Sequence, residues 1–169
     1  LKLDREKMQT QLQSVTAILE TAQKDLRVLL LHLRPVELEQ KGLVEGIQIL
    51  LKELEDKSDL KVGFKQNVTK LPKKIEEHIF RILQELISNT LRHAQAFCLD
   101  VYLYQTDFEL QLKVVDNGIG FQLGSLDDLS YGLRNIKERV EDMAGTVQLL
   151  TAPKQGLAVD IRIPLLDKE

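Results

Sequence analysis

Hydrophobic residues follow two different spacings along the chain, and these spacings predict where helices and strands lie. Four stretches repeat apolar residues every three or four positions, which is typical of amphipathic helices. Five shorter stretches alternate apolar and polar residues, which is typical of half-buried strands. The predicted helices are residues 3–33, 42–57, 72–94 and 132–144, and the predicted strands are residues 60–68, 97–105, 108–115, 146–151 and 157–163.

The order of these elements predicts an α+β fold. We expect a mixed, mostly antiparallel sheet with helices on one face, which is a two-layer α/β sandwich. The first helix is longer than such a sandwich needs, and it ends at Arg34-Pro35 because the residue before a proline disfavours helix. We therefore predict two parts: residues 1–35 as a helix suited to a bundle or dimer partner, or to packing on its own domain, and residues 36–169 as the globular domain.

Composition argues against several classes of protein. The formal net charge is -3, with 23 basic and 26 acidic residues, so the basic footprint of proteins that bind nucleic acids or anionic membranes is missing. No apolar run approaches the roughly 20 residues of a membrane-spanning helix. The single cysteine, Cys98, lies in an alternating apolar run typical of a sheet residue. Because the sequence begins abruptly in a helical pattern, we expect a soluble, cytosolic fragment whose membrane anchor could lie upstream.

The stretch VVDNGIGF, residues 114–121, joins a predicted strand to a turn that contains two glycines. Gly118 and Gly120 have no Cβ, so a ligand can approach their backbone, and both tolerate positive φ. Asp116, where the strand ends, supplies an acceptor suited to the exocyclic amine of adenine. By itself the stretch is more typical of a tight turn between two strands. Its interpretation as a pocket therefore depends on residues elsewhere.

The helix predicted over residues 72–94 carries a second group of polar side chains. Glu85, Asn89 and His93 follow at steps of four and share one helix face, with Arg92 beside them. Asn89 lies between apolar neighbours, where an asparagine needs a partner, and its amide oxygen suits a hard cation such as Mg²⁺. Glu85 could hold a metal-bound water or polarise a nucleophile, whereas Arg92 and His93 could contact phosphate oxygens. Taken singly, each is better explained as a surface or capping residue of the helix.

Two further segments complete a predicted nucleotide pocket. The segment from Phe121 through Ser130 is a loop of low hydrophobicity, too long for a simple connection, and is a candidate lid. Gly132 and Leu133 then begin a helix, whose free backbone N–H groups suit a phosphate. Adenine, Mg²⁺ and phosphate thus each have candidate contacts.

In this order the motifs resemble those of the ATP-binding domain of sensor histidine kinases, within the superfamily of gyrase B, Hsp90 chaperones and MutL. The resemblance implies the Bergerat ATP-binding fold. The matching segments are QELISNTLRHA (84–94) for the N box, DNGIGF (116–121) and YGLRNIKERVEDMAGT (131–146) for the two glycine boxes, and QGLAVDIRIP (155–164) for the closing hairpin.

The first part of the chain shows which subfamily of these kinases the sequence resembles. DLRVLLLHLRP (25–35) followed by GLVEGI (42–47) is similar to the second dimerisation helix and linker of the NarL-partner kinase subfamily. Within it, cell-envelope stress sensors of the LiaS and VraS type are the nearest likeness. Residues 1–35 then correspond to the second helix of the dimerisation and phosphotransfer region, without its first helix, and residues 36–169 to the catalytic domain.

The resemblance also implies roles for individual residues. Glu85 and Asn89 would be catalytic, with Asn89 as the Mg²⁺ ligand. Arg139 matches a frequent arginine of the second glycine box, but equally suits a surface ion pair. The residues implied in binding ATP and its Mg²⁺ are Asn89, Arg92, His93, Asp116, Gly118, Gly120, Gly132 and Leu133.

Three features depart from the family pattern. None of the three histidines, His32, His78 and His93, is followed by an acidic residue as a phosphoacceptor histidine would be. Leu157 stands where relatives usually carry a threonine that helps to hold adenine through water. Ser130-Tyr131-Gly132 keeps one glycine of the usual lid repeat, which implies a short lid.

The expected function is that of a histidine kinase domain that binds ATP-Mg²⁺ and donates the γ-phosphoryl group to a histidine on a missing helix. The expected partners are ATP, its own dimerisation domain in a homodimer, and a response regulator with helix-turn-helix output, with no nucleic acid or membrane contact. The expected location is the cytoplasmic part of a membrane-anchored sensor. The alternatives are an ATPase or anti-sigma-factor-like serine kinase with the same motifs, and a non-enzymatic dimerisation module.

Overall fold

The computed structural model describes residues 2–32, 41–122 and 130–165. The chain divides into two compact units, Leu1–Leu33 and Arg34–Glu169, which we describe separately. The first unit contains helix α1 (Lys2–His32), which agrees with the predicted helix to within one residue. Six of its apolar side chains are each at least 53% exposed, namely those of Met8, Leu12, Val15, Ile18, Leu19 and Leu26.

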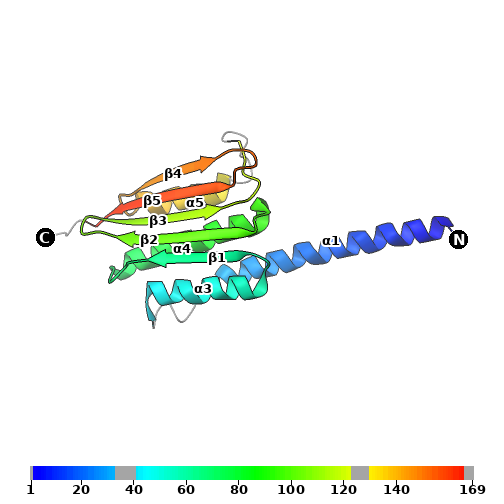
Figure 1. Ribbon diagram of the computed structural model, residues 1–169, viewed down its shortest axis with the longest axis horizontal. Coiled ribbons are helices and arrows are strands. Elements are labelled where there is room, and N and C mark those ends of the chain that lie inside the picture. The colour runs from blue at the N-terminus through cyan, green and yellow to red at the C-terminus, as the bar shows by residue number, and fades with distance from the viewer. Residues whose placement is uncertain (1, 33–40, 123–129, 166–169) are drawn as a thin grey trace. The chain divides into compact units, whose positions relative to one another are not determined.

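The second unit is built on one five-stranded sheet with the strand order β1-β2-β3-β5-β4 (Figure 1). Strand β1 runs parallel to β2, and the other neighbours are antiparallel. The predicted mixed, mostly antiparallel sheet is therefore confirmed. The strands are β1 (Lys61–Gln66), β2 (Cys98–Gln105), β3 (Glu109–Asp116), β4 (Thr146–Thr151) and β5 (Leu157–Pro164).

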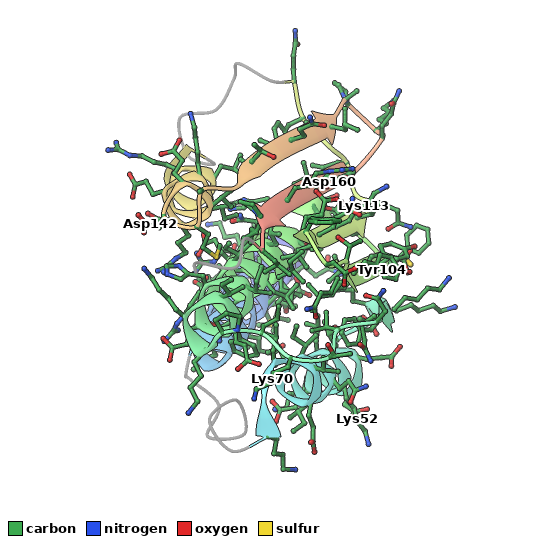
Figure 2. The ribbon with its side chains drawn as sticks, turned by 90° about the vertical axis from the view of Figure 1, so that its left-hand side faces the viewer. Lys52, Lys70, Tyr104, Lys113, Asp142 and Asp160 are labelled. Carbon is green, nitrogen blue, oxygen red and sulfur yellow. The ribbon has the colours of Figure 1, made fainter. Side chains whose placement is uncertain are left out.

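Helices cover one face of this sheet, as predicted. Helices α4 (Lys73–Asn89) and α5 (Ser130–Glu141) lie behind the strands in Figure 1, and α3 (Leu43–Lys57) packs beside β1 and α4. Alternate residues of the central strands point to this layer and are fully buried, because successive side chains of a strand face opposite sides. Figure 2 shows Tyr104, Lys113 and Asp160 on the other face of the sheet. The buried strand residues are Leu99, Val101, Leu103, Leu110, Leu112, Val114, Val159, Ile161 and Ile163.

The prediction of a single helix over residues 72–94 is wrong for its last turn, which is not α-helical. Helix α4 begins after Pro72, whose carbonyl oxygen accepts hydrogen bonds from the N–H groups of Ile75 and Glu76. It is α-helical only to Asn89, and a π-helical turn, η1 (Thr90–Ala94), follows. Such turns are rare and frequently lie at functional sites. The 3.6-residue period that predicted a single helix cannot reveal one wider turn at its end.

The helix predicted over residues 132–144 also has different bounds. Helix α5 begins at Ser130 and ends at Glu141. Ala144, rather than Gly145, adopts the left-handed conformation, with φ 54°. A Cβ at Gly145 would lie 2.6 Å from the carbonyl oxygen of Arg162. Gly145 is therefore required by close packing on β5.

Two predicted features lie outside the described residues. These are the Arg34-Pro35 stop and most of the candidate lid, residues 123–129. Within the described part of the chain, no helix combines the length and the apolar character that crossing a membrane requires.

Candidate functional site

A cavity of about 140 Å³ opens where α4 and η1 meet the end of β3 and the start of β5. Its wall combines apolar side chains with a few polar ones, which is the usual composition of a small-molecule site. The cavity is lined by Asn89, Thr90, His93, Ala94, Asp116, Ile119, Gly120, Phe121 and Leu157.

Asp116 is the buried acid of this cavity, with 5% of its surface exposed. It is the last residue of β3 and pairs in register with Leu157 on β5. Burial raises the pKa of its carboxyl group, because an ionised carboxylate loses hydration there. Hydrogen bonds from the backbone N–H groups of Gly118 and Leu157 and from the Thr90 hydroxyl oppose that rise. The Gly118 nitrogen lies 2.8 Å from Asp116 Oδ1.

The loop after Asp116 is held on both sides by hydrogen bonds. On one side Asn117 Oδ1 accepts from the N–H groups of Phe97 and Cys98, at 3.1 and 2.9 Å. The N–H of Ile119 donates to the carbonyl of Ala94, the last residue of η1, at 2.7 Å. Asn117 is thus a structural residue, which ties the loop to the start of β2.

On the other side, the loop is fixed to the hairpin between β4 and β5. Thr151 Oγ1 accepts from the Phe121 N–H at 3.1 Å and donates to the Gly156 carbonyl at 2.7 Å. Lys154 N–H donates to the Ile119 carbonyl. These contacts fix the backbone of the cavity wall through hydrogen bonds within the protein.

Two glycines of this loop are required by close backbone contacts. A Cβ at Gly118 would collide with the Ala94 carbonyl oxygen and lie 2.7 Å from Ala94 Cβ. Gly120 has φ +56°, and a Cβ there would collide with the Ala152 carbonyl oxygen. Gly120 lines the cavity, as predicted, whereas Gly118 lies beneath η1 and does not. The glycine that we had expected to face the ligand is instead needed for packing.

Asn89 and Glu85 form a second polar group, which faces α5. A Cβ at Gly132 would collide with Glu85 Oε1 and lie 3.3 Å from both amide atoms of Asn89. Asn89 Nδ2 is buried and has no hydrogen-bond partner among the described residues, although a buried amide normally has one. The Asn89 amide nitrogen is therefore left available to a hydrogen-bond acceptor of a ligand at the cavity.

The oxygen atoms near Asn89 suit a Mg²⁺ ion that is bound jointly by the protein and by substrate phosphates, rather than a site made of protein ligands alone. Among the described residues, no group of three or more His, Cys, Asp and Glu side chains could hold a metal. Mg²⁺ commonly binds one or two protein oxygens together with waters and substrate phosphates. An amide oxygen beside a carboxylate fits that mode.

The structure does not bring every predicted site residue to the cavity. Asn89, His93, Asp116 and Gly120 line it, and Glu85 and Gly132 lie beside Asn89. His93 and Arg92 are both exposed on η1. The residues that do not line the cavity are Glu85, Arg92, Gly118, Gly132, Leu133 and Arg139.

The sequence interpretation missed two threonines: Thr90, which lines the cavity, and Thr151, which holds the loop of the cavity wall. Thr90 lies four residues after Leu86, where the apolar stripe of α4 predicts another hydrophobic residue, and it is 6% exposed. The signal in the sequence was a residue with a hydroxyl group at a position where the apolar stripe of α4 predicts a buried hydrophobic side chain. Thr151 gave no such signal, because a threonine at the end of an exposed strand is ordinary.

Comparison with known proteins agrees with this arrangement. Residues 74–167 match the model of the family described as histidine kinase-, DNA gyrase B-, and HSP90-like ATPase. The chain is 39% identical over 148 residues to the sensor histidine kinase LiaS of Bacillus subtilis (strain 168). The aligned region covers 88% of this chain and 41% of LiaS. The chain is also 40% identical over 148 residues to the sensor protein VraS of Staphylococcus aureus (strain COL), covering 88% of this chain and 43% of VraS. The chain thus spans less than half the length of these curated relatives.

Solved structures share the fold at low sequence identity. The histidine kinase AdeS of Acinetobacter baumannii superposes with a TM-score of 0.60 at 19% identity, over 95% of this chain and 84% of that one. The histidine kinase domain of a blue-light activated kinase from Erythrobacter litoralis EL346 gives 0.58 at 20% identity, over 72% and 60%. The predicted fold class and the predicted resemblance to sensor histidine kinases are confirmed. The family model spans more than half of the sequence, and the chain therefore belongs to the family of histidine kinase-, DNA gyrase B- and HSP90-like ATPases.

Proposed function

We propose that this chain is the ATP-binding catalytic part of a sensor histidine kinase, which binds ATP with Mg²⁺ and donates the γ-phosphoryl group to a histidine outside this sequence. One observation carries the proposal. The same cavity is lined by a buried carboxylate, Asp116, and by an amide, Asn89, whose buried nitrogen has no partner. A family of ATPases and relatives that are sensor kinases support it further.

Asp116 is the group that would select adenine. An ionised carboxylate only accepts hydrogen bonds, so it suits the 6-amino group of adenine and repels the 6-oxo group of guanine. Ile119, Phe121 and Leu157 supply apolar wall around it, against which a planar base can pack.

Asn89 and its neighbours would bind the triphosphate. The Asn89 amide oxygen would hold Mg²⁺, which when bound would neutralise charge on the phosphate oxygens. Arg92 and His93 lie on η1, directly after Asn89, and would donate charge-assisted hydrogen bonds to phosphate. The first turn of α5, with Gly132 and Leu133, would offer backbone N–H groups to the same phosphates.

The proposed reaction is an in-line displacement at the γ-phosphorus. A lone pair of an imidazole nitrogen forms the N–P bond, the bond from phosphorus to the bridging oxygen breaks, and ADP leaves with that electron pair. Glu85 would polarise the imidazole by accepting a hydrogen bond from its other N–H. Because an imidazole is already a nucleophile, most of the catalysis would come from positioning and charge neutralisation.

The proposal extends to the rest of the signalling protein. Residues 1–35 would belong to the dimerisation and phosphotransfer region of a homodimer, and residues 36–169 to the catalytic domain. The acceptor histidine would pass its phosphoryl group to a response regulator with helix-turn-helix output. The fragment would be the cytoplasmic part of a membrane-anchored sensor of cell-envelope stress.

The test is to titrate the 169-residue protein with a fluorescent adenine nucleotide, with and without Mg²⁺. We expect tight binding only with Mg²⁺, and we expect Asn89→Ala to abolish that dependence with its melting temperature unchanged. Gln48→Ala removes an exposed amide from α3 and is the matched control. Equal affinity of the wild type and Asn89→Ala at every Mg²⁺ concentration would contradict the assignment.

The same preparation separates the alternatives. An ATPase would release inorganic phosphate in many turnovers without a protein acceptor, and a serine kinase would form an acid-stable phosphoprotein. A non-enzymatic dimerisation module would bind no nucleotide. A histidine kinase catalytic domain should instead phosphorylate a separately supplied dimerisation domain, with a product that is stable in base and labile in acid.

A further inference from the structure

We propose that Thr151 is a positioning residue for the base of the nucleotide: its hydroxyl group holds Phe121 in the cavity wall and thereby sets the affinity for the base, but not for the triphosphate. This inference rests on the ATP-binding function proposed above. It gives a role in that function to a residue that lies outside the cavity and in none of the matching sequence motifs.

The hairpin between β4 and β5 lies against the loop that follows β3. Figure 1 shows this hairpin and the end of β3 at the same end of the sheet. Thr151 is the last residue of β4 and pairs in register with Leu157, which on its other side pairs with Asp116. Leu157 and Asp116 line the cavity, whereas Thr151 does not. Any effect of Thr151 on a ligand therefore passes through its contacts with the cavity wall.

The Thr151 hydroxyl joins two backbone groups of different segments. Its Oγ1 accepts from the Phe121 N–H at 3.1 Å and donates to the Gly156 carbonyl oxygen at 2.7 Å. The Phe121 carbonyl oxygen is farther away, at 3.5 Å, so the single hydroxyl proton goes to Gly156. Because Thr151 is branched at Cβ, it has few χ1 rotamers, which keeps the oxygen in place. One side chain thus ties the loop to the hairpin.

The other contacts between this hairpin and the cavity wall are made by backbone. The Lys154 N–H donates to the Ile119 carbonyl oxygen at 2.5 Å. Gly120 has φ +56°, and a Cβ there would collide with a carbonyl oxygen of the hairpin. Ile119, Gly120 and Phe121 all line the cavity. Among the described residues, only the hydrogen bond of Thr151 joins the hairpin to these three residues through a side chain, so it is the contact that a substitution can remove.

Phe121 is the part of the wall where this contact would affect the base. It is half-buried and lines the cavity, and packing between an aromatic ring and a planar base depends on their relative position. Without the Thr151 hydroxyl, the Phe121 N–H and the carbonyl of the buried Gly156 both lose this partner. We expect the loop to shift and to lose packing against the base. The phosphate contacts proposed for Asn89 and η1 lie on other elements and should remain.

The experiment measures the affinities of two ligands with Mg²⁺, by displacement of a fluorescent adenine nucleotide. One is ATP, and the other is ribose 5-triphosphate, which has the sugar and phosphates of ATP but no base. Thr151→Val keeps the shape of the side chain without its hydroxyl. We expect this variant to bind ATP about tenfold more weakly, the effect of one lost hydrogen bond, and ribose 5-triphosphate as the wild type does.

Two further variants serve as controls. Thr151→Ser keeps the hydroxyl and should bind both ligands as the wild type does. Thr146→Val makes the same change at the exposed first residue of β4. It should leave both affinities unchanged.

The outcomes separate the inference from the proposed function. A wild type that binds neither ligand overturns both. A wild type that binds ATP, with Thr151→Val binding it equally well, overturns the inference alone. Equal weakening of both ligands by Thr151→Val would show a merely structural role and would also overturn it, as would a Thr151→Ser variant that binds ATP as weakly as Thr151→Val.

Should Thr151→Val not fold, hydrogen exchange of the Phe121 amide in the wild type decides. ATP should slow this exchange more than saturating ribose 5-triphosphate does, because only ATP carries a base to pack against the wall. Equal slowing by the two ligands would overturn the inference.

Discussion

At Asp116, burial and hydrogen bonding act in opposite directions on one carboxyl group. Asp116 is the last residue of β3 and is shielded from water, and this burial raises the pKa of its carboxyl group. The hydrogen bond from the Gly118 N–H to the Asp116 carboxylate, at 2.8 Å, opposes that rise. The residue identity was predictable from the DNGIGF motif, but this environment was not, because the cavity wall around Asp116 comes from separate elements.

The raised pKa of Asp116 predicts a pH dependence of base selectivity. Protonation removes an acceptor site, so ATP affinity should fall relative to purine ribonucleoside triphosphate, which has no 6-amino group, as the pH drops. Because the pKa is raised, this loss should begin at a higher pH than it would for an aspartate with an ordinary pKa. The measurement is the ratio of the two dissociation constants between about pH 8 and pH 5. The phosphates are the same in both ligands, so their titration cancels in the ratio.

The control for this pH dependence is Asp116→Asn, which has no proton to lose. Its ratio of dissociation constants should be the same at every pH, because the amide does not titrate. A wild-type ratio that is equally flat would contradict the role of Asp116.

Between elements, the site depends on close contacts at two glycines. Gly118 lies against the backbone of another element, whereas Gly132 lies against side chains, so substitution by alanine should have different effects at the two positions. Gly118→Ala would drive a Cβ into the backbone of Ala94, where the loop after β3 passes under η1. Backbone cannot move aside without disturbing both elements. We expect a loss of about 2–3 kcal/mol of unfolding free energy, measured by urea denaturation.

Gly132→Ala should leave the fold stable and damage the site. Its Cβ would meet the end of the Glu85 side chain, which can rotate, and press on the Asn89 amide at 3.3 Å. Alanine also favours helix over glycine by about 1 kcal/mol, so α5 should not lose stability. We expect an unchanged or higher melting temperature together with weaker Mg²⁺-dependent nucleotide binding. Unchanged binding would mean that the α4 and α5 contact does not serve the site.

At the level of the whole molecule, residues 36–169 contain a core of their own. All buried hydrophobic side chains of the described residues lie between Leu43 and Ile163. We therefore expect a variant that lacks residues 1–33 to keep its melting temperature and its affinity for fluorescent adenine nucleotide, by differential scanning calorimetry and titration. A large loss of either would contradict the predicted division into domains.

The chain as given should bind ATP without phosphorylating itself. Its histidines are His32, His78 and His93, and none precedes an acidic residue. We expect no radiolabel from γ-labelled ATP that is stable in base and labile in acid. Addition of a dimerisation domain with an acceptor histidine is the positive control. Labelling of the chain alone would contradict the prediction.

The sequence by itself determined the fold class and pointed to four of the nine residues that line the cavity, because both depend on local patterns. Strand alternation and helix periodicity placed the sheet and helices, and Asn89, His93, Asp116 and Gly120 lay within recognisable motifs. The tertiary structure decided what depends on contacts between distant segments. In the structure, α4 ends in a π-helical turn. Gly118, which was expected to lie beside a ligand, packs against Ala94 of that turn. The tertiary structure also placed Thr90 in the same cavity wall as Asp116, 26 positions later in the chain, because contacts between separate elements leave no periodic trace in sequence.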